Sequence, residues 1–578
     1  MKNIICNPLN LPYRYQQQIP RMTKEPLLSR EGADPTMLLF KDKYLLFVSM
    51  SGGFWYSDDL VDWKFHETPE LPIHDYAPDV RVVDGKVVFS ASAFDTCRLY
   101  VSEDPLNQPF IALPEEHPWW DPNVFQDDDG RVYLYWGCST KPMWAEELDR
   151  LSLKPISKKV NTIAGNPKEH GWERPGDNNV VAKPATPLDK ILRVLFGGGP
   201  YIEGTYVNKH DGHYYLQYAA PGTEYNVYGD GVYVSESPMG PWTYQKHNPF
   251  SSVPGGFITG AGHGSTFQDK NGKWWHVATM RISVNEKFER RVGLFPCDFD
   301  DDGILHCDQA LADYPFNAVT GQKMDWMLLN GVATASSSHP GHEPEKCCNE
   351  DVRTWWAAES TGADQWLMLD FGEIKTVNAV QVNFADQDLV LPKLEKKDYF
   401  KLPAGYRKIY VQDQKTKYLL KGSADGENWI VLQDRTDGTT DCCHDFLVLE
   451  QPAELRYLRL SNMDLPFGGV PAVSGLRAFG KGNSAKPAPV KSVRYRKVGD
   501  LNIHISWDAV PGAACYNVRY GIDPKKLYNS WQVRDNRLDL SFINKGEVYY
   551  AAVDAVNENG IAPGSIVRLN KTRADGSI

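Results

Sequence analysis

Acidic residues stand at the start of strand-like segments that recur through the first half of this chain. Asp34, Asp121 and Glu203 each precede a hydrophobic segment, and Asp79 stands in a similar phrase between the first two. An aromatic strand pattern follows each phrase, as in residues 132–136. Such a repeat places one carboxylate at the same position in each of several sheet units. If those units surround a common axis, the carboxylates meet at one site.

The composition bounds the size and the partners of the protein. A chain of 578 residues exceeds one ordinary hydrophobic core, so roughly two to four domains are expected. Hydrophobic residues make up 42% of the chain without a long uncharged apolar run, which predicts no membrane insertion. The formal net charge of −12 argues against a nucleic-acid partner, because nucleic acids bind basic surfaces.

The first 325 residues repeat one pattern of short strands and turns. Strands open near Asp34, Asp79, Asp121, Glu203 and His263, which makes five units. Asp-Asp-Gly and His-Asp-Gly phrases between strands are typical of β-hairpin turns. Repeats of four strands at this period predict a five-bladed β-propeller over residues 1–325, with its inner strands around a central channel.

Two further β-rich regions follow. Residues 326–482 contain short strands such as 366–371, where apolar and polar residues alternate as in a half-buried strand. A Pro/Ala/Ser-rich linker follows at residues 482–489, and residues 488–578 hold a second set of short strands. We therefore predict an all-β protein in which the propeller is followed by two β-sandwich domains.

Several phrases together resemble a known family. Residues 121–136, 203–219 and 262–275, together with the Asp-Pro phrase at Asp34, resemble the five-bladed propeller of glycoside hydrolase family 43. That family includes arabinofuranosidases and β-xylosidases. Residues 326–482 look like a discoidin-type module similar to carbohydrate-binding modules, and residues 488–578 look like a fibronectin type III domain.

The resemblance implies an inverting hydrolase with three catalytic carboxylates. By this comparison Asp34 is the general base, Glu203 is the general acid, and Asp121 holds the acid and raises its pKa through its negative charge. Thr205 departs from the family pattern, because many members carry proline there. Glu173, in the long insertion of residues 145–200, is the rival for the role of acid.

Other residues are expected around the substrate. We expect Asp79 to bind sugar hydroxyls and Trp120, next to Asp121, to form the floor of the pocket, although a core position fits Trp120 equally well. Arg281, Arg290 and Arg291 are candidates for an arginine that faces the pocket, and Arg291 is our choice among them.

A structural metal and the cysteines complete the predictions for this region. His263 stands where the family places a histidine near the propeller axis, linked through water to a bound calcium; a structural histidine is the alternative. The ten cysteines include two adjacent pairs, at 347–348 and 442–443, which either form disulfides in an oxidising compartment or remain free thiols. No signal-like segment follows Met1, and we expect a periplasmic or secreted protein, with a cytoplasmic one as the alternative.

These observations predict a monomeric exo-acting glycosidase that acts on an oligosaccharide or polysaccharide. The expected reaction is removal of terminal α-L-arabinofuranose from plant-type glycans; β-xylosidase or β-galactofuranosidase activity on the same scaffold is the alternative. A retaining invertase-like propeller is rejected, because its "NDPNG" and "RDP" phrases are absent. A glycan-binding protein without catalysis would lack one of the three carboxylates, and all three are present.

Overall fold

The computed structural model describes residues 3–21, 24–71, 76–92, 97–181, 183, 186, 200–282, 284–402 and 405–569. In these residues the chain consists of β-strands and turns with five short 3-10 helices and no α-helix, which confirms the all-β prediction. No helix within the described ranges is long and apolar enough to cross a membrane.

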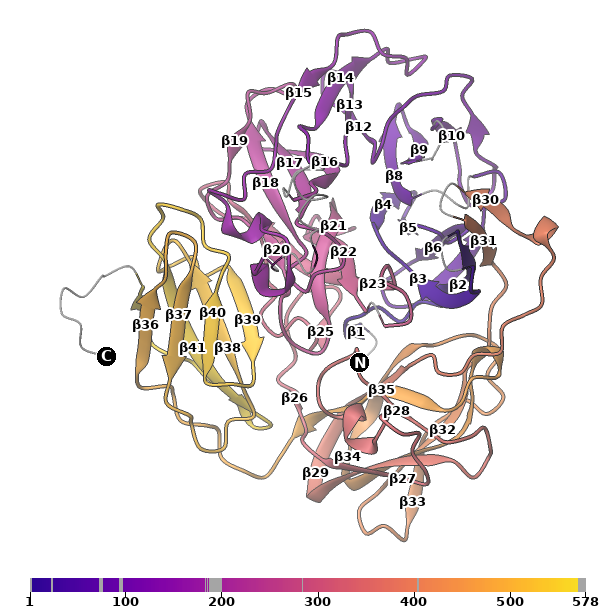
Figure 1. Cartoon of the computed structure of the whole chain (residues 1–578), viewed down its shortest axis with the longest axis vertical. Helices are drawn as coiled ribbons and strands as arrows, with labels where there is room; N and C mark the ends of the chain where they lie inside the picture. Colours follow the sequence, from indigo (N-terminus) through magenta and orange to yellow (C-terminus); the bar gives the residue numbers. More distant parts are fainter. Residues whose placement is uncertain are drawn as a thin grey trace.

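The first part of the chain forms five successive antiparallel sheets that surround a central axis (Figure 1), here called blades 1 to 5. Each has four strands in chain order, and β20 (Ser251–Ser252) adds a fifth strand to blade 4. The strands of blades 1 to 5 in turn are β4 (Thr36–Phe40), β5 (Lys43–Phe47), β6 (Gly53–Ser57), β7 (Trp63–Glu67); β8 (Tyr76–Val83), β9 (Lys86–Ser92), β10 (Tyr100–Ser102), β11 (Ile111–Ala112); β12 (Asn123–Gln126), β13 (Val132–Trp136), β14 (Trp144–Leu148), β15 (Val160–Asn161); β16 (Glu203–His210), β17 (His213–Ala220), β18 (Gly229–Ser235), β19 (Thr243–Tyr244); β21 (Thr259–Gln268), β22 (Trp274–Arg281), β23 (Arg290–Phe299), β24 (Leu305–Cys307).

Each blade begins at a predicted position, and its hairpins use the predicted turns. Between β12 and β13 the backbone N–H of Asp127 donates to Arg131 O at 2.9 Å, and Gly130 adopts a φ of 84°. Glycine suits this turn because it enters the left-handed region at little cost. Aromatic and branched residues then fill the space between neighbouring blades, as with Phe47, Phe89 and Phe110 between blades 1 and 2.

Hydroxyl groups link three pairs of neighbouring blades near the axis. Ser49 of blade 1 accepts a hydrogen bond from the Ala77 amide at the start of blade 2, and Ser92 of blade 2 accepts one from the Asp121 amide at the start of blade 3. Thr279 of blade 5 accepts the amide of Asp34 at 2.8 Å and so links the last blade to the first. These buried bonds fix the starts of the inner strands relative to one another.

The region after the propeller forms one large sheet of eight strands. Its longest strands are β29 (Trp366–Phe384) and β34 (His444–Asp464), so the strand predicted at 366–371 continues well beyond the expected end. The other strands are β26 (Met327–Leu328), β27 (Val332–Ala335), β28 (Trp356–Ala357), β32 (Lys417–Ser423), β33 (Trp429–Asp434) and β35 (Ala472–Lys481).

The last part of the chain contains two sheets that share one hydrophobic core. Trp507 of the first sheet and Val518 and Val553 of the second are fully buried there. The first sheet holds β36 (Val493–Lys497), β37 (Ile503–Trp507) and β40 (Arg537–Leu540); the second holds β38 (Cys515–Gly521), β39 (Asn529–Val533), β41 (Tyr550–Asn557), β42 (Gly560–Ala562) and β43 (Val567–Arg568).

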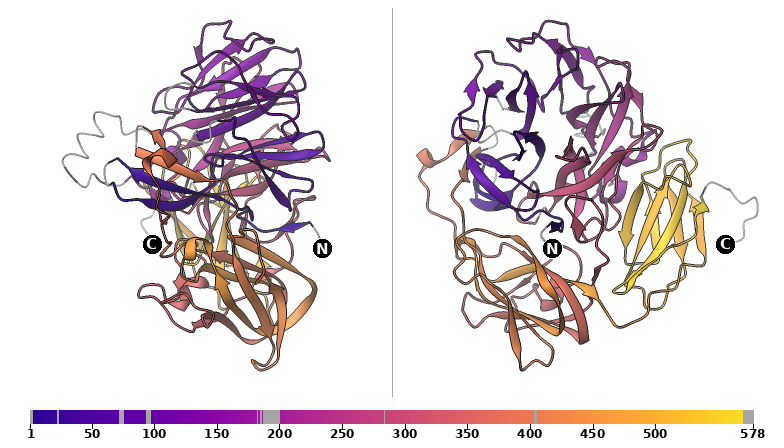
Figure 2. Two further views of the ribbon diagram at one scale, coloured as in Figure 1. Left: turned by 90° about the vertical axis from the view of Figure 1, so that its right-hand side faces the viewer. Right: turned by 180° about the vertical axis from the view of Figure 1, so that it is seen from behind.

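One sheet was not predicted from the sequence, because it joins segments that lie far apart in the chain. Strands β2 (Arg14–Pro20) and β3 (Leu27–Glu31) precede blade 1, and β2 pairs with β31 (Gly405–Tyr410), which in turn pairs with β30 (Phe400–Leu402). Figures 1 and 2 show the hairpin of β30 and β31 beside the first blades, on the outside of the ring. A two-stranded contact between β1 (Ile4–Ile5) and β25 (Phe316–Asn317) lies nearby.

All ten cysteines are free thiols in the structure, which is one of the two alternatives left open for residues 347–348 and 442–443.

Candidate active site

The residue that leads into each inner strand has an unusual backbone conformation. Asp34, Ala77, Asp121, Gly204 and His263 all have a positive φ, between 46° and 64°. A residue other than glycine rarely adopts this region, and such strain is found mostly at functional sites. The repeat therefore turns the chain in the same way at the inner end of all five blades.

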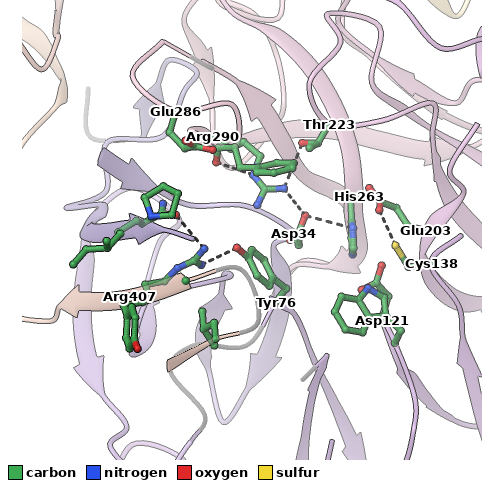
Figure 3. A pocket seen from close by; sticks show the side chains of 18 residues that line it. Asp34, Tyr76, Asp121, Cys138, Glu203, Thr223, His263, Glu286, Arg290 and Arg407 are labelled. Atoms are coloured by element: carbon green, nitrogen blue, oxygen red, sulfur yellow. Dashed lines mark hydrogen bonds and ion pairs between the residues drawn. The ribbon is translucent and has the colours of Figure 1, made fainter. Parts of the chain in front are cut away.

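A cavity of about 490 Å³ lies at this end of the propeller. Asp34, Asp121 and Glu203 line it together with His263 and Trp120 (Figure 3). The volume lies within the range of small-molecule sites. Carboxylates from blades 1, 3 and 4 thus reach one pocket, as the repeat in the sequence suggested.

Asp34 is held as an anion. It is only 5% exposed, and its carboxylate accepts a hydrogen bond from Ser49 Oγ at 2.7 Å. Arg290 Nη1 lies 3.5 Å and His263 Nδ1 3.4 Å from its Oδ1. Burial alone would raise the pKa of Asp34, but Arg290, His263 and these hydrogen bonds outweigh burial and lower it.

Asp121 has the opposite character. Ser92 Oγ donates to its Oδ1 at 2.8 Å, and the Gly204 amide lies 3.3 Å from its Oδ2. Burial is the largest cause of the raised pKa of Asp121, which is about 7. His263 lowers this pKa, whereas the negative charges of Glu203 and Asp34 raise it further. One proton is therefore retained at this position near neutral pH.

Glu203 sits at the start of β16 with both carboxylate oxygens engaged. The Tyr228 hydroxyl donates to Oε1, and the Cys138 thiol donates to Oε2 at 3.2 Å. Ligand atoms of Asp121, Cys138 and Glu203 all lie within 4.8 Å of one another, so the two carboxyl groups interact as a pair. Neither Tyr228 nor Cys138 was predicted from the sequence, because both lie outside the repeated acidic phrases.

Comparison with known proteins agrees with this site. Residues 23–305 match the model of glycosyl hydrolases family 43. This part of the chain is a family 43 glycoside hydrolase domain. The family 43 domain contains all five blades up to the last strand, β24, and all three predicted catalytic carboxylates.

Relatives of the family 43 domain carry names of related activities. A beta-xylosidase of Xylanibacter ruminicola is 29% identical over 184 residues, covering 28% of this chain and 53% of the relative. A putative beta-xylosidase of Escherichia coli is 25% identical, covering 43% and 48%. An arabinoxylan arabinofuranohydrolase of Paenibacillus polymyxa is 33% identical, covering 27% and 22%. The chain thus spans about half the length of the first two.

Arg290, rather than Arg291, faces the pocket of the family 43 domain. The expected residue, Arg291, donates from Nε to His444 Nε2 at 3.0 Å and does not line the cavity. Adjacent residues of a strand point to opposite faces of the sheet, so only one of the two can reach the pocket. Arg290 does so and also forms a short ion pair with Glu31.

Asp79 also lies outside this cavity, contrary to the prediction. It stands two residues beyond Ala77, the residue of blade 2 that corresponds to Asp34 and Asp121. Its carboxylate accepts Asn123 Nδ2 at 3.0 Å and the Val124 amide at 3.1 Å, both in blade 3. Asp79 therefore links two blades. Its phrase resembles those of Asp34 and Asp121 in the sequence, but Asp79 stands two residues after the corresponding position, which Ala77 occupies.

The rival acid, Glu173, is a buried structural residue. It is 0% exposed, and it accepts the Tyr218 hydroxyl at 2.6 Å and contacts His170 Nδ1 at 2.8 Å. It does not line the cavity. Thr205, which replaces the common proline of the family, donates its hydroxyl to Asp121 O at 3.2 Å and so supports the inner end of blade 4.

The surroundings of His263 do not fit direct coordination of calcium. Burial lowers the pKa of His263, but Asp34, Asp121 and Glu203 outweigh it and raise the pKa. Calcium prefers oxygen ligands, whereas the imidazole offers only nitrogen atoms. His263 pairs instead with Asp34, and no step of the chemistry below uses a metal.

Proposed function

We propose that this protein is an inverting, exo-acting glycoside hydrolase that removes terminal sugars from xylan- or arabinoxylan-type glycans. The observation that carries the proposal is the convergence of Asp34, Asp121 and Glu203 in one pocket, with Asp34 held as an anion next to a pair that retains a proton. Hydrolysis with inversion needs this combination of an ionised base and a protonated acid.

In this proposal Asp34 is the general base. Its lowered pKa keeps it ionised, and Arg290 and His263 hold its carboxylate in one orientation. An ionised carboxylate accepts a proton from a water molecule as that water attacks the anomeric carbon. Ser49 completes the orientation of the base by donating to its second oxygen.

Glu203 is the proposed general acid, with Asp121 as its partner. The two carboxyl groups interact as a pair, and burial together with the negative charge of Glu203 raises the pKa of Asp121 to about 7, which favours a proton on the pair. Glu203 delivers the proton to the leaving oxygen, and the pair of Asp121 and Glu203 then carries the additional negative charge. Tyr228 and Cys138 hold Glu203 in place through its two oxygens.

The ring of His263 favours inversion over retention. In Figure 3 it stands between Asp34 and Glu203, with its Nδ1 toward Asp34. Its opposite side packs against Gly204, the residue after Glu203. A side chain between the two carboxylates keeps them apart, whereas retention needs carboxyl groups only about 5–5.5 Å apart.

The sugar itself is proposed from the relatives and the sequence. The first expected substrate is a terminal α-L-arabinofuranosyl unit, since one relative is named an arabinoxylan arabinofuranohydrolase. β-Xylosidase activity is the main alternative, because two relatives carry that name; β-galactofuranosidase activity is the other. A glycan-binding protein without catalysis would leave the separate environments of Asp34 and Asp121 unexplained.

The later regions are proposed as accessory modules, the first discoidin-like and the second fibronectin type III-like. A separate sugar site at Trp355 and Trp356 is not part of this proposal. Trp356 is fully buried, and Trp355 donates its indole N–H to Gln387 at 3.0 Å.

The proposal is tested with two variants that preserve shape and remove acid–base capacity. We expect Asp34→Asn and Glu203→Gln each to lower kcat on arabino- and xylo-oligosaccharides by at least about 1,000-fold, while the melting temperature changes little. Glu173→Gln is the matched control and should keep its activity if it folds. Near-normal turnover by Asp34→Asn would refute its role as base.

A further inference from the structure

The hairpin of β30 and β31, here called the arm, reaches the catalytic pocket from outside the family 43 domain. It lies about 100 residues beyond the end of that domain at residue 305. Its strand β31 pairs with β2 from Tyr15↔Tyr410 to Pro20↔Gly405. Backbone pairing of this kind fixes the arm to the N-terminal strands, independently of its side chains.

The arm forms one wall of the pocket. Leu402, Gly405, Tyr406 and Arg407 line the same cavity as the three carboxylates. In Figure 3 Arg407 lies across Asp34 from Glu203. The general acid marks the side on which the leaving group departs, so the arm bounds the opposite end of the pocket.

Arg407 is embedded in this wall and keeps a donor unused. Its guanidinium donates to the Tyr76 hydroxyl at 2.7 Å and contacts Gln18 Oε1 at 3.3 Å. Its buried Nε has no hydrogen-bond partner among the residues that the structure describes. The protein shields that atom from the cavity, so the other guanidinium N–H groups of Arg407 are the ones available to a sugar at this wall.

Tyr406 presents an aromatic ring at the same wall. It is half-buried, and Lys396 lies over the ring at 5.4 Å from its centroid. Sugar sites commonly combine an aromatic surface with a few directed polar groups. Tyr406 and Arg407 supply both in a cavity that Trp120 also lines.

The arm is also connected to the general base. Strand β2, which pairs with the arm, supplies Gln16, whose Nε2 donates to Glu31 at 2.9 Å. Glu31 in turn pairs with Arg290, which contacts Asp34. The wall and the base therefore keep a fixed relative position.

We propose that the arm closes the pocket behind the terminal sugar and so makes the enzyme exo-acting. Tyr406 and Arg407 contact that sugar at the end opposite the cleaved bond. A chain that continued beyond this sugar would collide with the arm, so internal units are excluded. This inference rests on the proposed glycosidase function and adds a specificity determinant from outside the catalytic domain.

The test compares the products of wild type with those of the double variant Tyr406→Ala/Arg407→Ala on a linear oligosaccharide that the wild type cleaves. Wild type should release monosaccharide alone. The double variant should release disaccharide among the earliest products, and its KM for the aryl monoglycoside should rise about 30-fold, since an aromatic contact and a hydrogen bond together contribute about 2 kcal/mol. Chromatography of the early mixture and steady-state kinetics give the two readouts.

Two variants control for folding of the arm. Lys401→Ala, exposed on the adjacent strand and absent from the pocket lining, should keep the wild-type products and KM. Tyr406→Phe keeps the ring and should retain exclusive monosaccharide release. Unchanged products and an unchanged KM in the double variant would overturn the inference.

A binding measurement separates failure of this inference from failure of the proposed function. Calorimetry with a linear xylo-oligosaccharide and with a linear arabino-oligosaccharide, in an Asp34→Asn background, should show binding about 30-fold weaker when Tyr406 and Arg407 are both replaced. If wild type hydrolyses no glycan, the proposed function fails, while this binding result still decides the role of the arm. Equal affinity with and without the two side chains would remove the arm from the sugar site.

Discussion

Removal of the positive charge at Arg290 should move the pH dependence of catalysis. Arg290 Nη1 lies 3.5 Å from Asp34 Oδ1, and both side chains are about 5% exposed. With an effective dielectric constant of about 20, two unit charges at this distance attract by about 5 kcal/mol. Measured pKa shifts of an aspartate beside an arginine are about 1–3 units, because other groups adjust when one charge is removed.

We therefore expect Arg290→Gln to raise the pKa of Asp34 by about 1–3 units. Asp34 must be ionised to act as base, so the acid limb of kcat/KM against pH should shift upward by the same amount. Arg290→Lys, which keeps the charge, should shift the limb much less. An acid limb of Arg290→Gln that coincides with that of wild type would refute either the base role of Asp34 or the origin of its lowered pKa.

Two further predictions concern the inner ends of the blades. Gly204 has a φ of 64°, and an added Cβ would lie 2.7 Å from the His263 ring. We therefore expect Gly204→Ala to lower kcat about 100-fold. Gly212→Ala is the matched control and should stay active, because Gly212 has a φ of 78° and open space around it. Asp121 binds a proton more tightly in the folded state, with a pKa of about 7 against about 3.9 when unfolded, so its contribution to stability is lost as pH rises between these values. Asp121→Asn should remove this loss, which is about 4 kcal/mol, and melting curves at pH 5 and pH 8 should then differ less than those of wild type.

The repeat in the sequence predicted much of the catalytic domain. The inner strands begin within about four residues of the predicted positions, and the hairpin turns form where Asp-Gly phrases occur. Asp34, Asp121 and Glu203 line one pocket because each stands at the inner end of a blade. A periodic feature of this kind is visible in one sequence, since every copy repeats the same local chemistry.

Features that depend on strand register were not predictable. The choice between Arg290 and Arg291 depends on which face of β23 meets the pocket, and a shift of one residue reverses it. Asp79 resembles its counterparts in sequence but stands two residues too late. The first error concerns the face of the strand and the second the position along it, and a local phrase fixes neither.

The arm could not be inferred from the sequence for a different reason. Residues 405–410 pair with β2 nearly 400 positions earlier in the chain, as Tyr15 and Tyr410 show. Pairing between such distant strands leaves no local signal. The sequence therefore located the carboxylates and missed the wall that faces them.

The configuration of the first product tests the central claim most directly. If Asp34 activates water and Glu203 protonates the leaving oxygen, the sugar is released in one displacement, and its anomeric configuration is inverted. Proton NMR of the early reaction mixture, before mutarotation, should show the inverted anomer alone. A first product with retained configuration would contradict the account, because it requires a covalent glycosyl-enzyme and a carboxylate in contact with the anomeric carbon.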